Sequence, residues 1–232
     1  MTSVEITTVF FDFGNTLVAS TSGVEIWRRV MGELGLAVDL GQLEAAIREE
    51  DRAVILQYYD YRGRMPAFWE RYDRRVLDRL GIADHHETVR QRIEAGFDAG
   101  RWHRPYPETR GILESLRSMD YRLGVISNNT DDIHRTLGAH DLAGYFDHVT
   151  YSQEVRAEKP DPAVFRLALD RAECDPSEAI HVGDIYEADI VGARAVGMFP
   201  VLVDRDDRRP NADCLRIRDL RELVPLLEGR NF

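Results

Sequence analysis

The chain has 232 residues, of which 44% are hydrophobic, and its 41 acidic and 30 basic side chains give a formal charge of −11. This length and composition predict a globular protein with a sizeable core. The acidic balance opposes unspecific binding of nucleic acid, and no apolar run approaches the ~20 residues that cross a bilayer. We therefore expect neither nucleic acid nor a membrane as a partner.

The beginning of the chain and its cysteines favour a particular compartment. Residues 1–5 have no basic segment ahead of an apolar stretch, which a secretory signal would require. Cys174 and Cys214 have no metal-ligand spacing around them and suit a reducing environment. We expect a cytoplasmic protein that is a monomer or a homodimer.

Short apolar runs rich in β-branched residues recur along the chain, and each ends in small or polar residues. They span residues 6–13, 122–127, 148–152, 179–183 and 199–203. The segments between these runs have apolar residues at helical spacing. One of them begins with Asp161 and Pro162, a pair that is typical of a helix start. This alternation predicts an α/β fold with a doubly wound parallel sheet and a Rossmann-like core, which binds ligands beyond the carboxyl ends of its strands.

Residues 17–103 interrupt that alternation. Apolar residues repeat there at helical spacing, as in Trp27, Met31 and Leu34, and no convincing strand pattern occurs. We interpret this segment as an inserted α-helical domain. Residues 1–16 and 104–232 then form a Rossmann-like core.

Aromatic residues and arginines gather within the predicted helical insert. They are Tyr58, Tyr59, Tyr61, Arg62, Arg64, Phe68, Trp69 and Tyr72. Their helical spacing favours aromatic residues in the insert's own core and arginines on a solvated face. The alternative is that some of them face a small anionic substrate.

Polar residues follow four of the predicted strands. Asp12 follows the first, Ser127 ends the second, Lys159 comes after the third, and Asp184 follows the fourth. Lys159 is the only lysine, since the other 29 of the 30 basic residues are arginine. An ammonium is a compact charge that can contact two anionic oxygens at once, whereas a guanidinium needs a wider partner. We therefore expect chemistry at Lys159.

These elements, in this order, resemble the haloacid dehalogenase superfamily over most of the chain. The family pattern has a nucleophilic aspartate with a threonine four residues later, then a serine or threonine after a strand, a lysine, and a Gly-Asp with a further aspartate. The chain matches it with Asp12, Thr16, Ser127, Lys159 and the segment 183–189. The helical insert also lies where this family places its cap. The resemblance therefore implies an α-helical cap domain of residues 17–103 and a Rossmann-like catalytic core of residues 1–16 and 104–232.

The resemblance implies attack of the Asp12 carboxylate on phosphorus, which would form an aspartyl-phosphate. Lys159, Ser127 and Thr16 would assist as catalytic residues. Ser127, Asn128 and Lys159 would bind the phosphoryl group of the substrate. The substrate class implied is a small phosphorylated metabolite.

The resemblance also implies a Mg²⁺ cofactor. Its ligands would be Asp12, the carbonyl of Gly14 and Asp184, with Asp189 orienting either a metal-bound water or Lys159. Three carboxylates carry a charge of −3, which one Mg²⁺ and one ammonium balance. Mg²⁺ keeps several waters, so few protein ligands suffice.

Gly14 departs from the phosphatase pattern, which has a second aspartate there as general acid and base. Loss of such a group costs on the order of 10²–10⁴ in rate. Two alternatives therefore remain open: a 2-haloacid dehalogenase, which lacks that aspartate but also lacks the metal and the Gly-Asp element, and a non-catalytic phospholigand-binding relative. The phosphonatase branch needs a cap lysine, and this insert has none. We predict a Mg²⁺-dependent phosphatase.

Overall fold

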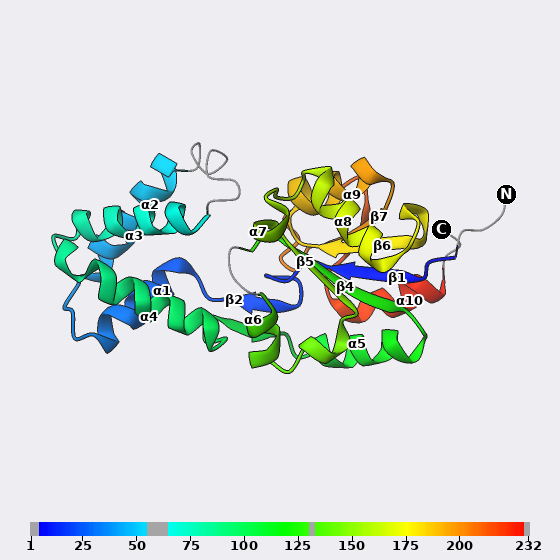
Figure 1. Ribbon diagram of the computed structural model, residues 1–232, viewed down its shortest axis with the longest axis horizontal. Helices are drawn as coiled ribbons and strands as arrows, with labels where there is room; N and C mark the ends of the chain where they lie inside the picture. Colours follow the sequence, from blue (N-terminus) through cyan, green and yellow to red (C-terminus); the bar gives the residue numbers. More distant parts are fainter. Residues whose placement is uncertain (1–4, 55–64, 130–132, 230–232) are drawn as a thin grey trace. The chain divides into compact units, whose positions relative to one another are not determined.

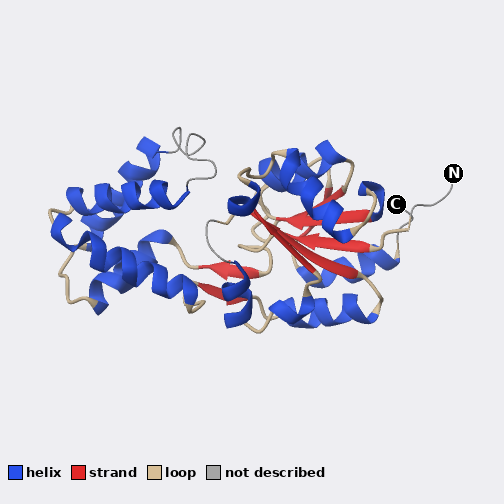
Figure 2. Cartoon of the chain, viewed as in Figure 1, coloured by secondary structure: helices blue, strands red, loops and turns tan. Residues whose placement is uncertain are grey.

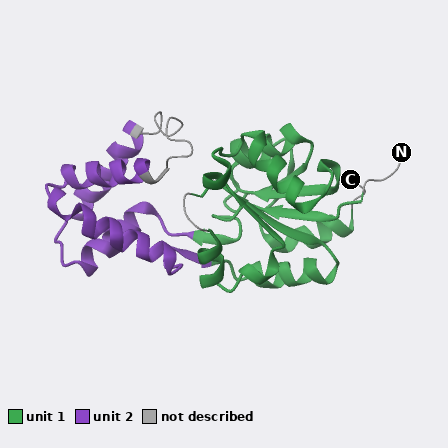
Figure 3. Cartoon of the chain, viewed as in Figure 1, with its two compact units in different colours: residues 1–19, 105–232 green, residues 20–104 purple. Residues whose placement is uncertain are grey.

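The computed structural model describes residues 5–54, 65–129 and 133–229, which belong to two compact units (Figure 3). The first unit combines Met1–Ala19 with Pro105–Phe232, and the second is Ser20–Arg104. Strands are concentrated in the first unit, while helices occur in both (Figure 2). Among the described residues, no helix is both long enough and apolar enough to cross a membrane.

A six-stranded parallel sheet forms the centre of the first unit. In the spatial order β5-β4-β1-β6-β7-β8, its strands are His148–Tyr151, Arg122–Ser127, Thr8–Phe11, Ala179–Gly183, Phe199–Val203 and Leu215–Ile217. The order runs outward from β1 in both directions, so the sheet is doubly wound. This confirms the predicted fold class and all five predicted strand regions. The short β8 was not predicted.

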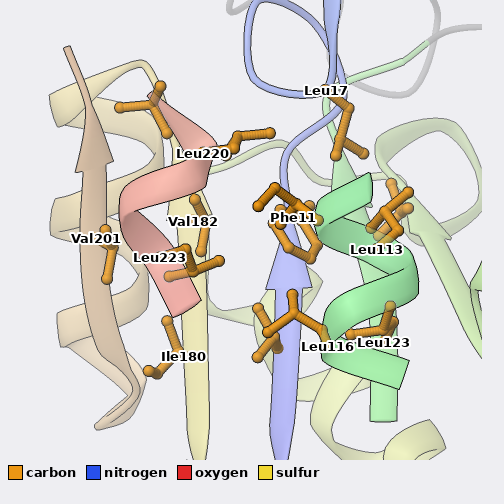
Figure 4. Close-up of a cluster of buried hydrophobic side chains, with 14 of the residues drawn as sticks. Phe11, Leu17, Leu113, Leu116, Leu123, Ile180, Val182, Val201, Leu220 and Leu223 are labelled. Carbon is orange, nitrogen blue, oxygen red and sulfur yellow. The ribbon is translucent and has the colours of Figure 1, made fainter. Parts of the chain in front are cut away.

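Side chains of β1 alternate between two hydrophobic cores, as expected for a strand buried on both faces. Val9 and Phe11 pack with α5 (Thr109–Ser118), α6 (Ile133–Ala139) and α10 (Leu223–Glu228). Phe10 packs on the other face with α8 (Pro162–Ala172) and α9 (Val191–Val196). Figure 1 shows these helix layers, and Figure 4 shows Phe11 within the first core. The sheet is thereby fixed from both sides.

Helix α8 begins where the sequence predicts. The Asp161 carboxylate accepts the Ala163 N–H at 2.9 Å, and Pro162 occupies the first turn. Gly192 of α9 permits close packing here, because a Cβ at that position would lie 2.4 Å from the Phe165 ring and 3.1 Å from Cα of Pro160. The segment that carries Lys159 is thus held against the sheet by two packed helices.

The second unit contains four described helices of eleven or more residues. They are α1 (Gly23–Glu33), α2 (Leu40–Val54), α3 (Met65–Arg79) and α4 (His86–Asp98). Their apolar faces meet in one core that includes Trp27, Phe68, Tyr72 and Trp102. Phe68 and Tyr72 are buried, whereas Trp69 is 42% exposed.

The other residues of the predicted aromatic and arginine cluster lie outside the described residues: Tyr58, Tyr59, Tyr61, Arg62 and Arg64. Two short strands that the sequence did not indicate, β2 (Val18–Ser20) and β3 (His103–Pro105), pair with each other. A strand of three residues is too short to produce a recognisable period of two. The α7 helix (Ser152–Val155), which follows β5, is equally short.

Candidate active site

The polar residues predicted to form a site come from the carboxyl ends of neighbouring parallel strands. Asp12 follows β1, Ser127 is the last residue of β4, and Asp184 follows β6. Because β4, β1 and β6 are adjacent and parallel, these ends lie at one edge of the sheet. Carboxylate oxygens of Asp12, Asp184 and Asp189 all lie within 4.8 Å of one another.

Lys159 lies among these carboxylates. Its Nζ donates to Oδ1 of Asp12 at 2.7 Å, to Oδ1 of Asp189 at 2.7 Å and to the carbonyl of Ile126 at 2.8 Å. The side chain is only 2% exposed. Burial opposes its charge, but Asp12 and Asp189 outweigh burial and raise the pKa of Lys159. The three acceptors use all three hydrogens of an ammonium ion.

Asn128 holds the backbone of Lys159. Its Oδ1 accepts the Lys159 N–H at 2.7 Å, and its Nδ2 donates to the Lys159 carbonyl at 3.1 Å. Both ends of the side-chain amide are therefore engaged by one residue. Ser127, the preceding residue, is buried at the strand end. The pair of bonds fixes where the lysine side chain departs from its loop.

Asp189 belongs to a π-helical turn, Tyr186–Ile190, and its carboxylate is surrounded by donors. Its Oδ1 accepts from Lys159 and from Nε2 of His181 at 2.9 Å, and its Oδ2 accepts the Ile185 N–H at 2.9 Å. Burial alone would raise the pKa of Asp189, but the charge of Lys159 and the His181 hydrogen bond hold it below its ordinary value. Asp189 is therefore an anion.

Gly183 explains why the Asp189 side chain reaches this position. A Cβ on residue 183 would lie 2.2 Å from Cγ of Asp189, a separation that atoms cannot adopt. Only glycine leaves room for the carboxylate to fold back over the end of β6. The glycine of the Gly-Asp pair thus serves packing, because it makes room for the side chain of Asp189.

Asp12 and Asp184 have a different environment. Burial raises the pKa of Asp12 to about 6, against the opposing effect of Lys159. Burial, and then the charges of Asp12 and Asp189, raise the pKa of Asp184 to about 7. Oδ1 of Asp184 is buried and has no hydrogen-bond partner among the described residues. Carboxylates buried this close together repel each other, and a bound cation would remove that cost.

Gly14 and Thr16 lie in the turn that follows Asp12. The N–H groups of Leu17 and Val18 both donate to the Phe13 carbonyl, at 3.0 and 3.2 Å. Thr16 is fully buried, and its hydroxyl has no hydrogen-bond partner within the described ranges. The sequence pattern thus brings Thr16 into the same turn as the nucleophile candidate, but the structure records no bond from its hydroxyl to Asp12.

Arg205 supports this turn and was not identified from sequence. It is the second residue after the end of β7. It donates to the Thr16 carbonyl at 3.0 Å and to Glu108 at 2.7 Å, and it stacks 3.5 Å above the centre of the Tyr106 ring. His181 was also missed. The available signals were a charged residue just beyond a strand end for Arg205 and a polar residue inside an apolar strand for His181.

The haloacid dehalogenase-like hydrolase family has a model that matches residues 6–197. That span is more than half of the chain, and the chain belongs to this family of hydrolases. The membership confirms the resemblance carried by the strand-end residues. It also agrees with the fold, in which a parallel sheet presents these residues at one edge.

Two curated relatives are phosphatases. A phosphoserine phosphatase of Thermus thermophilus is 38% identical over 161 residues, which cover 67% of this chain and 64% of that protein. A glyceraldehyde 3-phosphate phosphatase of Methanopyrus kandleri is 31% identical over 239 residues, covering 94% and 97%. Among solved structures, a 2-haloacid dehalogenase from Pseudomonas syringae pv. Tomato is 28% identical with a TM-score of 0.71, covering 97% and 99%.

Proposed function

We propose that this hydrolase is a Mg²⁺-dependent phosphatase of small phosphorylated metabolites, with Asp12 as the nucleophile. One observation carries the proposal: Lys159 holds Asp12 at 2.7 Å while the neighbouring Asp184 keeps a buried carboxylate oxygen without a described partner. The first contact orients a nucleophile. The second provides a carboxylate oxygen that is available to a cation.

In the first step, a carboxylate oxygen of Asp12 attacks phosphorus and forms the aspartyl-phosphate, as the bond from phosphorus to the substrate oxygen breaks. The ammonium of Lys159, which contacts Asp12 directly, balances the charge that accumulates on the phosphoryl oxygens. In the second step, water attacks the same phosphorus, releases inorganic phosphate and restores the carboxylate. Gly14 has no side chain that could deliver a proton to the departing oxygen.

The residues present fit a divalent cation with a preference for oxygen ligands. Asp12, Asp184 and the backbone carbonyl of Gly14 would hold Mg²⁺, which would supply positive charge to the phosphoryl group. Asp189 fits this group less well, because donors already engage both of its oxygens. Of the two tasks expected for Asp189, its contacts support the orientation of Lys159.

The relatives support the substrate class. Both the phosphoserine phosphatase and the glyceraldehyde 3-phosphate phosphatase are named for small phosphorylated metabolites. The second of them matches nearly the whole length of both proteins. The similarity therefore extends over both units of this chain and is consistent with a related type of substrate.

A dehalogenase is the second candidate, and two observations favour it: glycine at position 14 and the 28% identity to a 2-haloacid dehalogenase structure. In such an enzyme the aspartate attacks carbon and displaces halide without a metal. The cluster of three carboxylates argues against this interpretation, because without a cation the ammonium of Lys159 would be left to balance Asp12, Asp184 and Asp189 alone.

The deciding experiment measures two products from one preparation. We expect phosphate release from a panel of metabolite phosphates with Mg²⁺, loss of release in EDTA, and none from Asp12→Asn under either condition. The same preparation is given 2-haloacids without metal. Halide release there, with no phosphate release, would replace the phosphatase by the dehalogenase. Binding of phosphorylated ligands without either product would instead indicate a non-catalytic relative.

A further inference from the structure

His181 is the one described residue of β6 whose side chain is titratable. It lies between Ile180 and Val182 in the middle of the strand, and its exposed fraction is 0%. The Phe165 ring packs against it edge-on, with ring centres 5.2 Å apart. An apolar side chain would fill this place in the core, so the imidazole requires another explanation.

One hydrogen bond connects this imidazole to the site. Nε2 of His181 lies 2.9 Å from Oδ1 of Asp189, the same oxygen that accepts from Nζ of Lys159 at 2.7 Å. Burial lowers the pKa of His181, so the ring is neutral and carries one N–H. Asp189 is an anion and can only accept, so the hydrogen is on Nε2.

The other ring nitrogen has no such contact. Nδ1 of His181 is buried and has no hydrogen-bond partner in the part of the chain that the structure describes. A buried acceptor without a partner lowers the stability of the folded state. Histidine is therefore a poor residue for stability at this position, and its Nε2 bond to Asp189 is the contact that distinguishes it from leucine or methionine.

We propose that His181 is a positioning residue, which fixes the Asp189 carboxylate so that the Lys159 ammonium stays in contact with Asp12. The inference rests on the proposed function and extends it. Ile185 holds one Asp189 oxygen and His181 holds the other, so the carboxylate cannot rotate about its own axis. Lys159 then has a fixed second acceptor beside Asp12. Catalysis is sensitive to small displacements of such a group.

The test compares His181→Leu, which removes the donor and keeps an apolar volume, with His181→Gln, which keeps an N–H donor at similar reach. For His181→Leu we expect kcat to fall about 10–100-fold, as for other outer supporting contacts, with KM and the Mg²⁺ requirement nearly unchanged. Its Tm should change little, because the loss of an unpaired buried acceptor offsets the loss of the hydrogen bond to Asp189. His181→Gln should recover most of kcat.

Two further variants separate positioning from packing. Phe165→Leu disturbs the packing around the imidazole but leaves its donor, and should lower Tm more than kcat. In an Asp189→Asn background, His181→Leu should have little additional effect on kcat, because both changes act through one contact. Full kcat in His181→Leu, additive losses in the double variant, or a loss of kcat that simply follows Tm would each overturn the inference.

A measurement that needs no substrate keeps this inference distinct from the proposed function. Nitrogen-15 NMR of the imidazole should show a neutral ring with its proton on Nε2, and Asp189→Asn should shift that proton signal. A proton on Nδ1 overturns the inference even if phosphate is released with Mg²⁺. If the tautomer is as expected but the unmodified enzyme releases halide alone, the proposed function fails, and the same variants are compared by halide release.

Discussion

Both units bury carboxylates, but they neutralise them differently. In the second unit, Glu50 has a fully buried side chain that forms ion pairs with Arg75 at 2.7 Å and with Arg79 at 3.4 Å. In the first unit, three carboxylates lie together, and the one ammonium among them, that of Lys159, pairs with Asp12 and Asp189. A buried acid with enough cationic partners is neutralised within the fold, whereas an excess of buried anions prepares a site for an added cation.

The largest expected effect tests whether the site needs an ammonium or only a positive charge. Lys159→Arg keeps the charge, but a planar guanidinium cannot reproduce three contacts of 2.7–2.8 Å that converge on one nitrogen. We expect kcat for phosphate release to fall about 10³-fold, nearly as far as in Lys159→Ala. Circular dichroism should show that both variants remain folded.

Arginine already satisfies the buried acid of the second unit, so the two units differ in what they require of a cation. If Lys159→Arg retained most of its turnover, that difference would disappear. The first unit would then need only charge balance, as Glu50 does. The functional interpretation of the single lysine would be wrong.

The second prediction concerns the proton that Gly14 cannot supply. Turnover should depend steeply on the leaving group, so that acyl and aryl phosphates, and anomeric sugar phosphates, react much faster than alkyl phosphates. A good substrate should also give a burst of leaving group equal to the enzyme concentration, because water must then attack the phosphorylated Asp12 without a base. Rapid-quench kinetics measures both effects.

Gly14→Asp should raise turnover of alkyl phosphates about 10²-fold and diminish the burst. Gly14 is not among the described glycines with a positive φ, so an aspartate can adopt its backbone conformation. Asn15→Asp, one residue further along, is the matched control and should not have this effect. A flat dependence on the leaving group in the unmodified enzyme would mean that another residue already provides the proton.

The third prediction separates the two aspartates of the 183–189 segment. Asp184→Asn should raise the Mg²⁺ concentration for half-maximal turnover about 10–100-fold, since it removes a formal charge from the oxygens proposed as ligands. Asp189→Asn should lower kcat with a much smaller change in the Mg²⁺ requirement, because its oxygens are engaged by Lys159, His181 and Ile185. Mg²⁺ titration of activity distinguishes them.

Identical Mg²⁺ curves for Asp184→Asn and the unmodified enzyme would place the cation elsewhere, whereas turnover independent of Mg²⁺ in both would favour the dehalogenase. A shift in Asp189→Asn as large as that in Asp184→Asn would contradict the assignment of Asp189 to Lys159. Each result therefore tests one carboxylate of the first unit separately.

The sequence predicts the sheet and the strand-end residues because both follow from local patterns. Apolar runs mark buried strands, and parallel strands bring their carboxyl ends to one edge, so Asp12, Ser127 and Asp184 were expected together. The distinct surroundings of Asp184 and Asp189 were not predictable. These surroundings depend on which hydrogen-bond donors the fold brings near each carboxylate. His181, which contacts Asp189, resembles a core residue in the sequence.

The buried charges of the second unit were equally hidden. Helical periodicity predicted apolar faces for the insert, but it does not reveal that Glu50 on α2 lies against arginines of α3. Nor does it indicate that Asp73 on α3 is only 6% exposed. Ion pairs between helices depend on packing angles that residue spacing does not contain.

Asp73 gives the last and smallest prediction. It tests whether the second unit neutralises every buried carboxylate as it neutralises Glu50. Burial, and then the charge of Glu94, raise the pKa of Asp73 to about 7 against the opposing effect of Arg90, from an ordinary value of 3.8. The folded state therefore binds this proton more tightly than the unfolded state, and stability should rise as pH falls from 8 toward 5. Since one pKa unit corresponds to about 1.4 kcal/mol, we expect a gain of roughly 1 to 3 kcal/mol.

Urea unfolding followed by tryptophan fluorescence measures this unit alone, because the three tryptophans of the chain, Trp27, Trp69 and Trp102, all lie within Ser20–Arg104. Asp73→Asn should be more stable than the unmodified protein at pH 8 and lose the gain on acidification, since an amide does not ionise. Asp78→Asn, an exposed position on the same helix, should retain it. If Asp73→Asn kept the full pH dependence, Asp73 would be compensated as Glu50 is, and the second unit would bury no carboxylate at a cost to its stability.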